Sequence, residues 1–232
     1  MGNGGSRMCK NIESLTQTAT DSPSQSQSIN PVYLSTVPAP TPTDPTRRKP
    51  IDRKTDYVLS YSHRDPDISA LYKSLDDANN RHIGHTVDTF TKRTALFSGF
   101  EIKPASGNHA EAELQMSIWI AAALCKKQEL ARSAQVSLDP AAIVEPALTI
   151  VGHEHAVYYA YPREDVVSGR GGVHVLGPDV DRFERLSTDS IRGIFRLIRM
   201  YGNLLEYGMD ERNDGYWGGF LKPILYQLAG IA

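Results

Sequence analysis

A carboxylate and an ammonium group stand two positions apart in the sequence Phe100-Glu101-Ile102-Lys103. In a strand, alternate side chains share a face, so Glu101 and Lys103 would point the same way, away from Phe100 and Ile102. The apolar neighbours indicate a buried strand, where an unpaired charge is costly. The pair therefore indicates either a structural ion pair or a hydrolytic metal site.

In the metal-site interpretation, Glu101 binds a divalent cation and the main-chain carbonyl of Ile102 adds an oxygen ligand. Lys103 then positions a water molecule or stabilises negative charge on a phosphate. Mg²⁺ suits this role because it takes oxygen ligands from one or two carboxylates and from substrate phosphates. A second carboxylate, Asp56, opens an apolar stretch, which is an unfavourable place for an acid unless it is bound. If the two strands pair, Asp56 and Glu101 can share one cation.

A glutamine in the following helix is a further candidate for this site. Apolar residues at helical spacing predict a helix over residues 109–134. Gln115 and Trp119 stand four positions apart and share one side of that helix. Gln115 can therefore reach the site, although an ordinary surface glutamine is the alternative interpretation.

The elements that must position these residues are expected throughout residues 51–232. Aromatic and β-branched stretches predict strands at residues 56–61, 94–103, 148–151, 156–161 and 173–176. Further helices are predicted at residues 67–78, from an N-cap at Thr188 to about Glu206, and in a last segment ending at Leu228. Strands and helices mix without strict alternation, which favours an α/β fold with a mixed sheet.

The order of these motifs resembles the PD-(D/E)XK superfamily, and in particular a nuclease-like domain found in many uncharacterised fungal proteins. The segments that carry the resemblance are Asp56-Tyr-Val58, Arg81-His-Ile-Gly-His-Thr86, Lys92-Arg-Thr94, Phe100-Glu-Ile-Lys103, Ala112-Glu-Leu-Gln-Met-Ser-Ile-Trp119, Leu148-Thr-Ile-Val-Gly-His153 and Ser187-Thr-Asp-Ser-Ile-Arg-Gly-Ile194. The resemblance covers roughly residues 51–230. It implies a restriction-endonuclease-like core, in which helices flank a central mixed β-sheet. It also implies Asp56, Glu101 and Lys103 as the catalytic triad, with Gln115 as an auxiliary residue.

Two features differ from the superfamily's pattern. Thr55 replaces the proline that names the superfamily, and only residues 11–19, with Glu13, correspond to the acidic helix that usually precedes the aspartate strand. Two functions therefore stay open. One is a metal-dependent phosphodiester hydrolase, a nuclease that acts on DNA or RNA with Mg²⁺ or Mn²⁺. The other is a catalytically inert nuclease-like fold that serves as a nucleic-acid-binding or protein-interaction module.

Three arginines of the predicted helix after Thr188 are candidates for binding nucleic acid. They recur at i, i+4 and i+7 and are Arg192, Arg196 and Arg199. Such a stripe is either an ordinary solvated face of the helix or a surface that contacts phosphates. The opposite side of the helix is expected to be buried through Ile191, Ile194, Phe195 and Ile198.

The first 50 residues have a different composition from the rest. Serine, threonine and proline account for 21 of them, and apolar residues show no period. Such a segment buries too little surface to offset its chain entropy, so residues 1–50 are predicted to be disordered. The start, Met1-Gly-Asn-Gly-Gly-Ser6, fits the pattern for myristoylation of Gly2, with Cys9 as a candidate second acylation site.

The overall composition limits the partners and the compartment. With a net charge of −2, the protein does not attract polyanions through its overall electrostatic field, so any contact with nucleic acid needs a local basic patch. No apolar run approaches the roughly 20 residues of a membrane span, and no secretion signal is recognisable at the start. The two cysteines are too few for a disulfide framework. We therefore expect an intracellular protein of the nucleus or cytoplasm that is not secreted.

Overall fold

A computed structural model describes residues 27–28, 54–137, 143–163, 172–178, 186–213 and 215–231 of the chain. Its elements, in chain order, are β1 (Gln27–Ser28), β2 (Lys54–Thr55), β3 (Tyr57–Ser60), α2 (Pro66–Asp77), the 3-10 turn η2 (Thr91–Arg93), β4 (Leu96–Lys103), α3 (His109–Ser133), β5 (Glu145–Val151), β6 (Glu154–Arg163), β7 (Gly172–Leu176), β8 (Leu186–Ser187), α4 (Ile191–Gly208), the π-helical segment η4 (Tyr216–Leu221) and α5 (Lys222–Leu228).

Six of the described strands form one sheet. Five run in the order β3-β4-β5-β6-β7, and β8 pairs with β6. β4 and β5 are parallel, and α3 provides the long crossover connection that parallel neighbours need. The other neighbours in this sheet are antiparallel. The mixed sheet with flanking helices confirms the α/β prediction.

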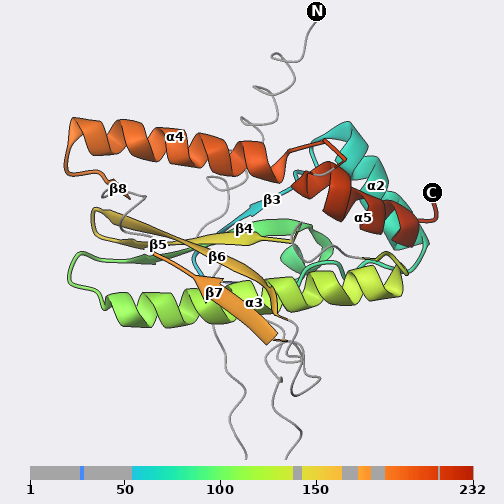
Figure 1. Ribbon diagram of the computed structural model, residues 1–232. Coiled ribbons are helices and arrows are strands. Elements are labelled where there is room, and N and C mark those ends of the chain that lie inside the picture. Colours follow the sequence, from blue (N-terminus) through green and yellow to red (C-terminus); the bar gives the residue numbers. More distant parts are fainter. Residues whose placement is uncertain are drawn as a thin grey trace, which may run out of the picture.

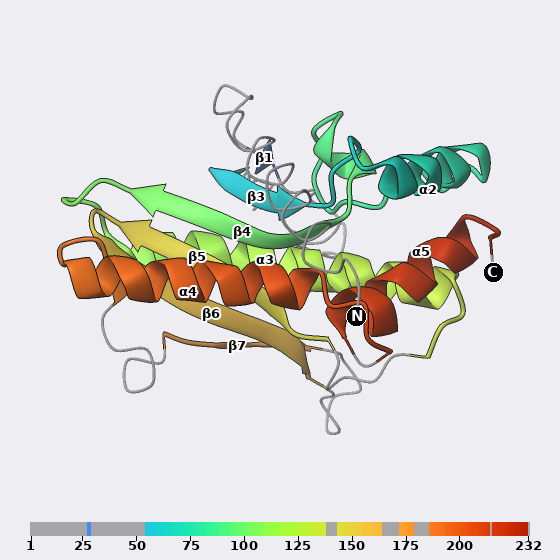
Figure 2. The ribbon, with the colours of Figure 1, turned by 90° about the horizontal axis from the view of Figure 1, so that it is seen from above.

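Two helices cover the two faces of the sheet. α3 lies against one face and α4 against the other, so the fold has three layers (Figures 1 and 2). Between α4 and the sheet, Leu197, Met200 and Leu204 pack in one apolar cluster with Phe100 and Leu148. β4 is covered on both faces as a result, which explains why six of its eight residues are buried.

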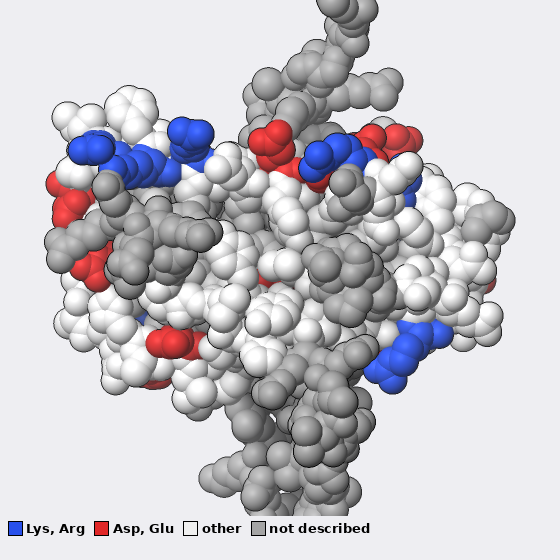
Figure 3. All heavy atoms as spheres, in the orientation of Figure 1, with Lys and Arg blue, Asp and Glu red and all other residues white. Residues whose placement is uncertain are grey.

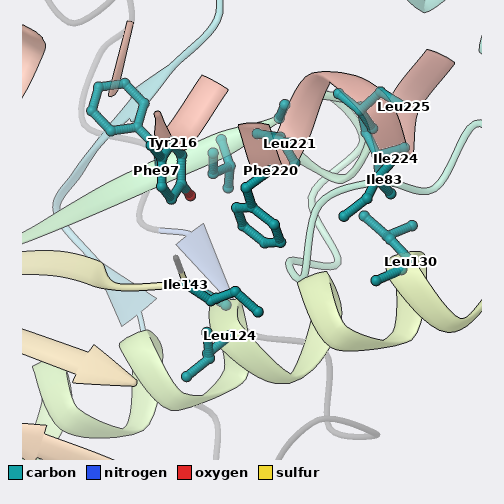
Figure 4. Close-up of a cluster of buried hydrophobic side chains, with 14 of the residues drawn as sticks. Ile83, Phe97, Leu124, Leu130, Ile143, Tyr216, Phe220, Leu221, Ile224 and Leu225 are labelled. Carbon is teal, nitrogen blue, oxygen red and sulfur yellow. The ribbon is translucent and has the colours of Figure 1, made fainter. Parts of the chain in front are cut away.

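A larger core lies where α3, η4 and α5 meet, and Figure 4 shows part of it. Its fully buried side chains include Leu124 of α3, Tyr216 and Phe220 of η4, and Ile224 of α5. α2 contacts α5 at the same end of the molecule. This core stabilises the end of the fold that lies away from the β4–α3 connection.

One ion pair is enclosed in this larger core. Nζ of Lys127 in α3 donates to both carboxylate oxygens of Glu145, the first residue of β5, and the Tyr216 hydroxyl donates to the same carboxylate at 2.8 Å. Burial lowers the pKa of Lys127 and raises the pKa of Glu145, while each partner's charge opposes the shift of the other. The sequence prediction did not include this pair.

Several predicted boundaries are wrong. The strand expected over residues 56–61 is interrupted at Asp56, which forms a bend between β2 and β3. α4 begins at Ile191, and its N-cap is Ser190 rather than Thr188, since the Ser190 hydroxyl accepts from the N–H of Gly193 at 3.1 Å. The predicted disorder of residues 1–50, the acylation of Gly2 and the thiol of Cys9 lie outside the described residues, except that Gln27–Ser28 pairs with Lys54–Thr55.

The orientation of α4 differs from the prediction. Four large apolar side chains that were expected to be buried are exposed, namely Ile191, Ile194, Phe195 and Ile198. The helix faces the sheet with a different set, namely Gly193, Leu197, Met200, Leu204 and Gly208. α4 carries two apolar arcs, and the sheet covers one of them.

Candidate metal centre

Asp56 is held against β4 by two hydrogen bonds. Its N–H donates to the carbonyl of Phe100 at 3.2 Å, and its carboxylate oxygen Oδ2 accepts from the N–H of Ile102 at 2.7 Å. The antiparallel register pairs Tyr57 with Phe100. Asp56 therefore lies at the bend before β3, close enough to Glu101 for its charge to act on that carboxyl, which is consistent with the shared-cation hypothesis.

Glu101 is almost completely buried and only partly neutralised. The residue is 3% exposed. Its Oε1 lies 3.0 Å from Nζ of Lys103, whereas its Oε2 is buried without a hydrogen-bond partner. Burial raises the pKa of Glu101, the hydrogen bond from Lys103 opposes this shift, and the negative charge of Asp56 adds to it. An ionised Glu101 therefore needs more positive charge than Lys103 provides.

Lys103 lies between two carboxylates. Besides its contact with Glu101, its Nζ is 3.8 Å from Oε1 of Glu111 in the first turn of α3. The turn between β4 and α3 allows this geometry, because a Cβ on Gly107 would lie 2.6 Å from the Cβ of Lys103. Glu111 was not among the predicted site residues, although it stands four positions before Gln115 on the same side of the helix.

Besides Oε2 of Glu101, a side-chain oxygen of α3 is also buried without a hydrogen-bond partner. The ring of Trp119 packs on Gly99, where a Cβ would lie 2.7 Å from the ring. Since Lys103 is near Glu111 and Gly99 is near Trp119, Glu101 lies opposite the middle of this stretch, at Gln115. Oε1 of Gln115 is buried and has no hydrogen-bond partner. The structure thus brings Asp56, Glu101 and Lys103 together at one end of β4, and we infer from the positions along α3 that Gln115 faces them.

Ile102 contributes through its main chain. In a strand, the N–H and C=O of one residue leave on the same edge. The N–H of Ile102 donates to Asp56, so its carbonyl also faces the edge where Asp56 lies. Asp56 and this carbonyl therefore lie at one edge of β4, while the carboxylate of Glu101 stands on the adjoining face of the strand, toward α3.

This donor set fits a hard divalent cation. Oxygen ligands suit Mg²⁺ and Mn²⁺, and the unpartnered Oε2 of Glu101 is a carboxylate oxygen that a cation would satisfy. Within the described ranges, no group of three or more His, Cys, Asp or Glu residues is placed to hold a metal ion. A cation here would therefore rely on two carboxylates, neutral oxygens and water or substrate.

The three predicted phosphate-binding arginines lie on the other face of the sheet. Arg192 and Arg199 of α4 are exposed and Arg196 is half-buried. α4 starts at the site's end of the sheet, because Thr188 N–H donates to the His153 carbonyl and the neighbouring Gly152 N–H donates to the Lys103 carbonyl, both at 3.0 Å. The structure does not bring the arginines to Glu101, and their role in binding nucleic acid stays a prediction.

The fold and the site together define a class of protein. It is a three-layer α/β fold in which a Glu-x-Lys strand and an adjacent aspartate meet at one end of the sheet, beside a crossover helix that carries a glutamine. The sequence model of the PD-(D/E)XK nuclease superfamily matches residues 6–217, and the chain belongs to this superfamily. Searches of curated proteins and of solved structures each found no match. The match does not test the fungal origin, which stays a prediction.

Proposed function

We propose that this protein is a metal-dependent phosphodiester hydrolase that acts on nucleic acid. The observation that carries the proposal is the state of Glu101. A carboxylate that is 3% exposed keeps one oxygen without a partner and lies beside a second carboxylate, Asp56. Such an arrangement is unfavourable for stability alone, and perturbed carboxylates of this kind cluster at functional sites. Membership of a nuclease superfamily supports the same reaction class.

Each residue has a role that follows from its position. Asp56 and Glu101 would hold Mg²⁺ or Mn²⁺ together with the carbonyl oxygen of Ile102. When bound, the cation would activate a water molecule and offset the charge of the scissile phosphate. Lys103 would orient the attacking water and stabilise negative charge that develops on the phosphate. Gln115, with its buried oxygen, would fix the position of Glu101 or of that water.

A second candidate function is an inert nuclease-like module that binds nucleic acid or protein. Two observations favour it. Lys103 already makes a 3.0 Å contact with one oxygen of Glu101, as a structural ion pair would. The described residues also include no group of three metal-ligating side chains. In either case we keep the proposal of an intracellular protein of the nucleus or cytoplasm.

A nuclease assay of the full chain separates the two functions. The substrates are labelled single- and double-stranded DNA and RNA, each with Mg²⁺, with Mn²⁺ and with EDTA. We expect cleavage only in the presence of a divalent cation, no cleavage by Glu101→Gln, and cleavage by Lys103→Ala that is slower by about 10²–10³. The matched control is Lys73→Ala, which removes an exposed lysine of α2 at the other end of the fold.

The inert-module function makes a different prediction. If the unmutated protein cleaves none of these substrates and calorimetric titration detects no binding of Mn²⁺ at millimolar concentrations, the hydrolase proposal is wrong. Folding of each variant is checked by thermal melting, so that loss of activity is not confused with loss of structure.

A further inference from the structure

The outward side of α4 carries a patch whose composition the fold does not explain. Its apolar side chains are 77%, 42%, 68% and 61% exposed, in the order Ile191, Ile194, Phe195 and Ile198. Two exposed cations, Arg192 and Arg199, lie within the same nine residues. We call these six residues the α4 outer face.

The helical geometry puts these side chains into two adjacent arcs. With 100° per residue, Ile194, Ile198 and Ile191 follow one another within about 60°, and Phe195 stands about 40° further round. Around the helix axis, Arg199 lies about 40° and Arg192 about 60° beyond Phe195. Phe195 therefore lies near the middle of the exposed side, between an apolar arc and a basic arc. Figure 3 shows Lys and Arg side chains gathered over the first half of α4, beside uncharged surface.

An exposed patch of this size marks an interaction surface. Single exposed apolar side chains are common, but four in about two turns form a contiguous patch, which is typical of sites that bind a protein or a membrane. The buried arc of α4 already packs on the sheet through Leu197, Met200 and Leu204. The fold therefore does not need the outer arc for its own core.

The charge on α4 favours an anionic surface as the partner. No Asp or Glu occurs between Ser190 and Leu205, whereas three arginines do. A second copy of α4 would bring like charges together, which is unfavourable. Nucleic acid would use the arginines, but phosphate contacts give no reason for the exposed Phe195 and Ile198. A lipid surface with anionic headgroups uses both, because its phosphates bind arginine and its acyl region takes apolar side chains.

We propose that the α4 outer face binds the surface of an anionic lipid membrane. Phe195 and Ile198 insert below the headgroups, while Arg192 and Arg199 contact lipid phosphates. No described helix is long and apolar enough to cross a bilayer. α4 would lie in the plane of the interface, because its other side packs on the sheet through Leu197, Met200 and Leu204.

Vesicle flotation of the full, unacylated chain tests the surface by itself. The vesicles contain phosphatidylcholine with either no phosphatidylserine or about one third of it, because each basic residue gains attraction from anionic lipid. We expect binding only to the anionic vesicles and a loss of binding at high salt. Phe195→Ser with Ile198→Ser, and separately Arg192→Gln with Arg199→Gln, should each weaken the partition by at least about tenfold.

The matched controls are Phe90→Ser and Lys73→Gln, which remove an exposed aromatic ring and an exposed cation elsewhere. They should bind vesicles as the unmutated protein does. No binding to anionic vesicles, or equal binding by the α4 variants, overturns the proposal. If light scattering shows a dimer that Phe195→Ser with Ile198→Ser dissociates, the occupant is a second copy. If the arginine variants instead lose only binding to a labelled DNA duplex, the occupant is nucleic acid.

Discussion

The carboxylate of Asp56 accepts a 2.7 Å hydrogen bond from the main-chain N–H of Ile102. This bond holds Asp56 against β4, the strand that carries Glu101 and Lys103, whether or not a cation is bound. A negative charge is thereby kept beside Glu101, where it raises the pKa of that carboxyl. The site is held in place by the protein before any ligand enters it.

This relationship predicts different results for two substitutions of Asp56. In Asp56→Asn, the amide oxygen can still accept from Ile102, so we expect a melting temperature close to that of the unmutated protein. The lost charge should nevertheless weaken Mn²⁺ binding at least about tenfold, because even residues outside the ligand shell contribute about 10–100-fold. Asp56→Ala also loses the hydrogen bond, which contributes roughly 1.5–3 kcal/mol. Calorimetric titration with Mn²⁺ and thermal melting measure the two effects, and an asparagine variant with unchanged affinity would exclude Asp56 as a ligand.

A second prediction concerns the dependence of stability on pH. The pKa of Glu101 is raised in the folded protein, mainly by burial, so folding becomes less favourable as pH rises from the usual glutamate range, near 4.3, through the raised value. Glu101→Gln removes this charge. In EDTA, we therefore expect the variant to melt at a higher temperature than the unmutated protein at pH 7–8, and the difference to vanish at about pH 4.

Adding Mn²⁺ should reverse that order. The unmutated protein gains stability from the bound cation, while Glu101→Gln does not. Glu129→Gln is the control, because Glu129 is a half-exposed carboxylate of α3 that forms an ion pair with Lys126 of the same helix. If Glu101 is only the partner of Lys103 in a structural ion pair, its replacement lowers the melting temperature at neutral pH and Mn²⁺ has no effect on either protein.

The strands and helices near the site could be predicted because their signals are local. β4 follows from a stretch rich in apolar and aromatic residues, and α3 begins where expected, after Asn108, whose side chain accepts from Ala110 N–H at 2.9 Å. The alternation in β4 also predicts that Glu101 and Lys103 share a face, and their 3.0 Å contact confirms it. These features depend on neighbours within a few positions in the sequence.

The features that were missed depend on contacts between distant segments. The pairing of Lys127 with Glu145 joins α3 to the start of β5, and no spacing in the sequence shows it. The exposure of Phe195 depends on which of two apolar arcs of α4 meets the sheet. Both arcs have helical spacing, so periodicity alone cannot choose between them. Glu111 could have been found, since it lies one turn before Gln115.

A third prediction separates the role of Lys103 from that of the metal ligands. Lys103 is a cation and cannot be a ligand, so Lys103→Ala should retain Mn²⁺ binding. Its loss removes stabilisation of developing negative charge, and single groups of this kind contribute about 10²–10³ in rate. Because Lys103 also opposes the rise in the pKa of Glu101, the acidic limb of the remaining activity should move to higher pH. Unchanged cleavage by this variant, measured against Lys73→Ala, would show that Lys103 has no catalytic role.

The last prediction concerns the buried pair of Lys127 and Glu145. Both side chains are almost fully enclosed, at 6% and 0% exposure. Lys127→Met leaves the Glu145 carboxylate buried with only the hydroxyl of Tyr216, and an uncompensated buried charge costs roughly 3–5 kcal/mol. The double variant Lys127→Met with Glu145→Gln has no such charge, and Tyr216 keeps an oxygen to which it can donate. We therefore expect it to recover most of the lost stability in urea unfolding.

The neighbouring Lys126 is a matched control for this experiment. It is equally buried, at 6% exposure of its side chain, but its partner Glu129 is 44% exposed. When Lys126→Met removes the cation, water still solvates Glu129, so that partner contributes no more than about 1 kcal/mol to the loss. A double-mutant cycle on Lys127 and Glu145 then measures their coupling directly. A coupling near zero, or a cost for Lys127→Met no larger than that for Lys126→Met, would mean that Glu145 becomes protonated at little cost and that the pair contributes little to the core.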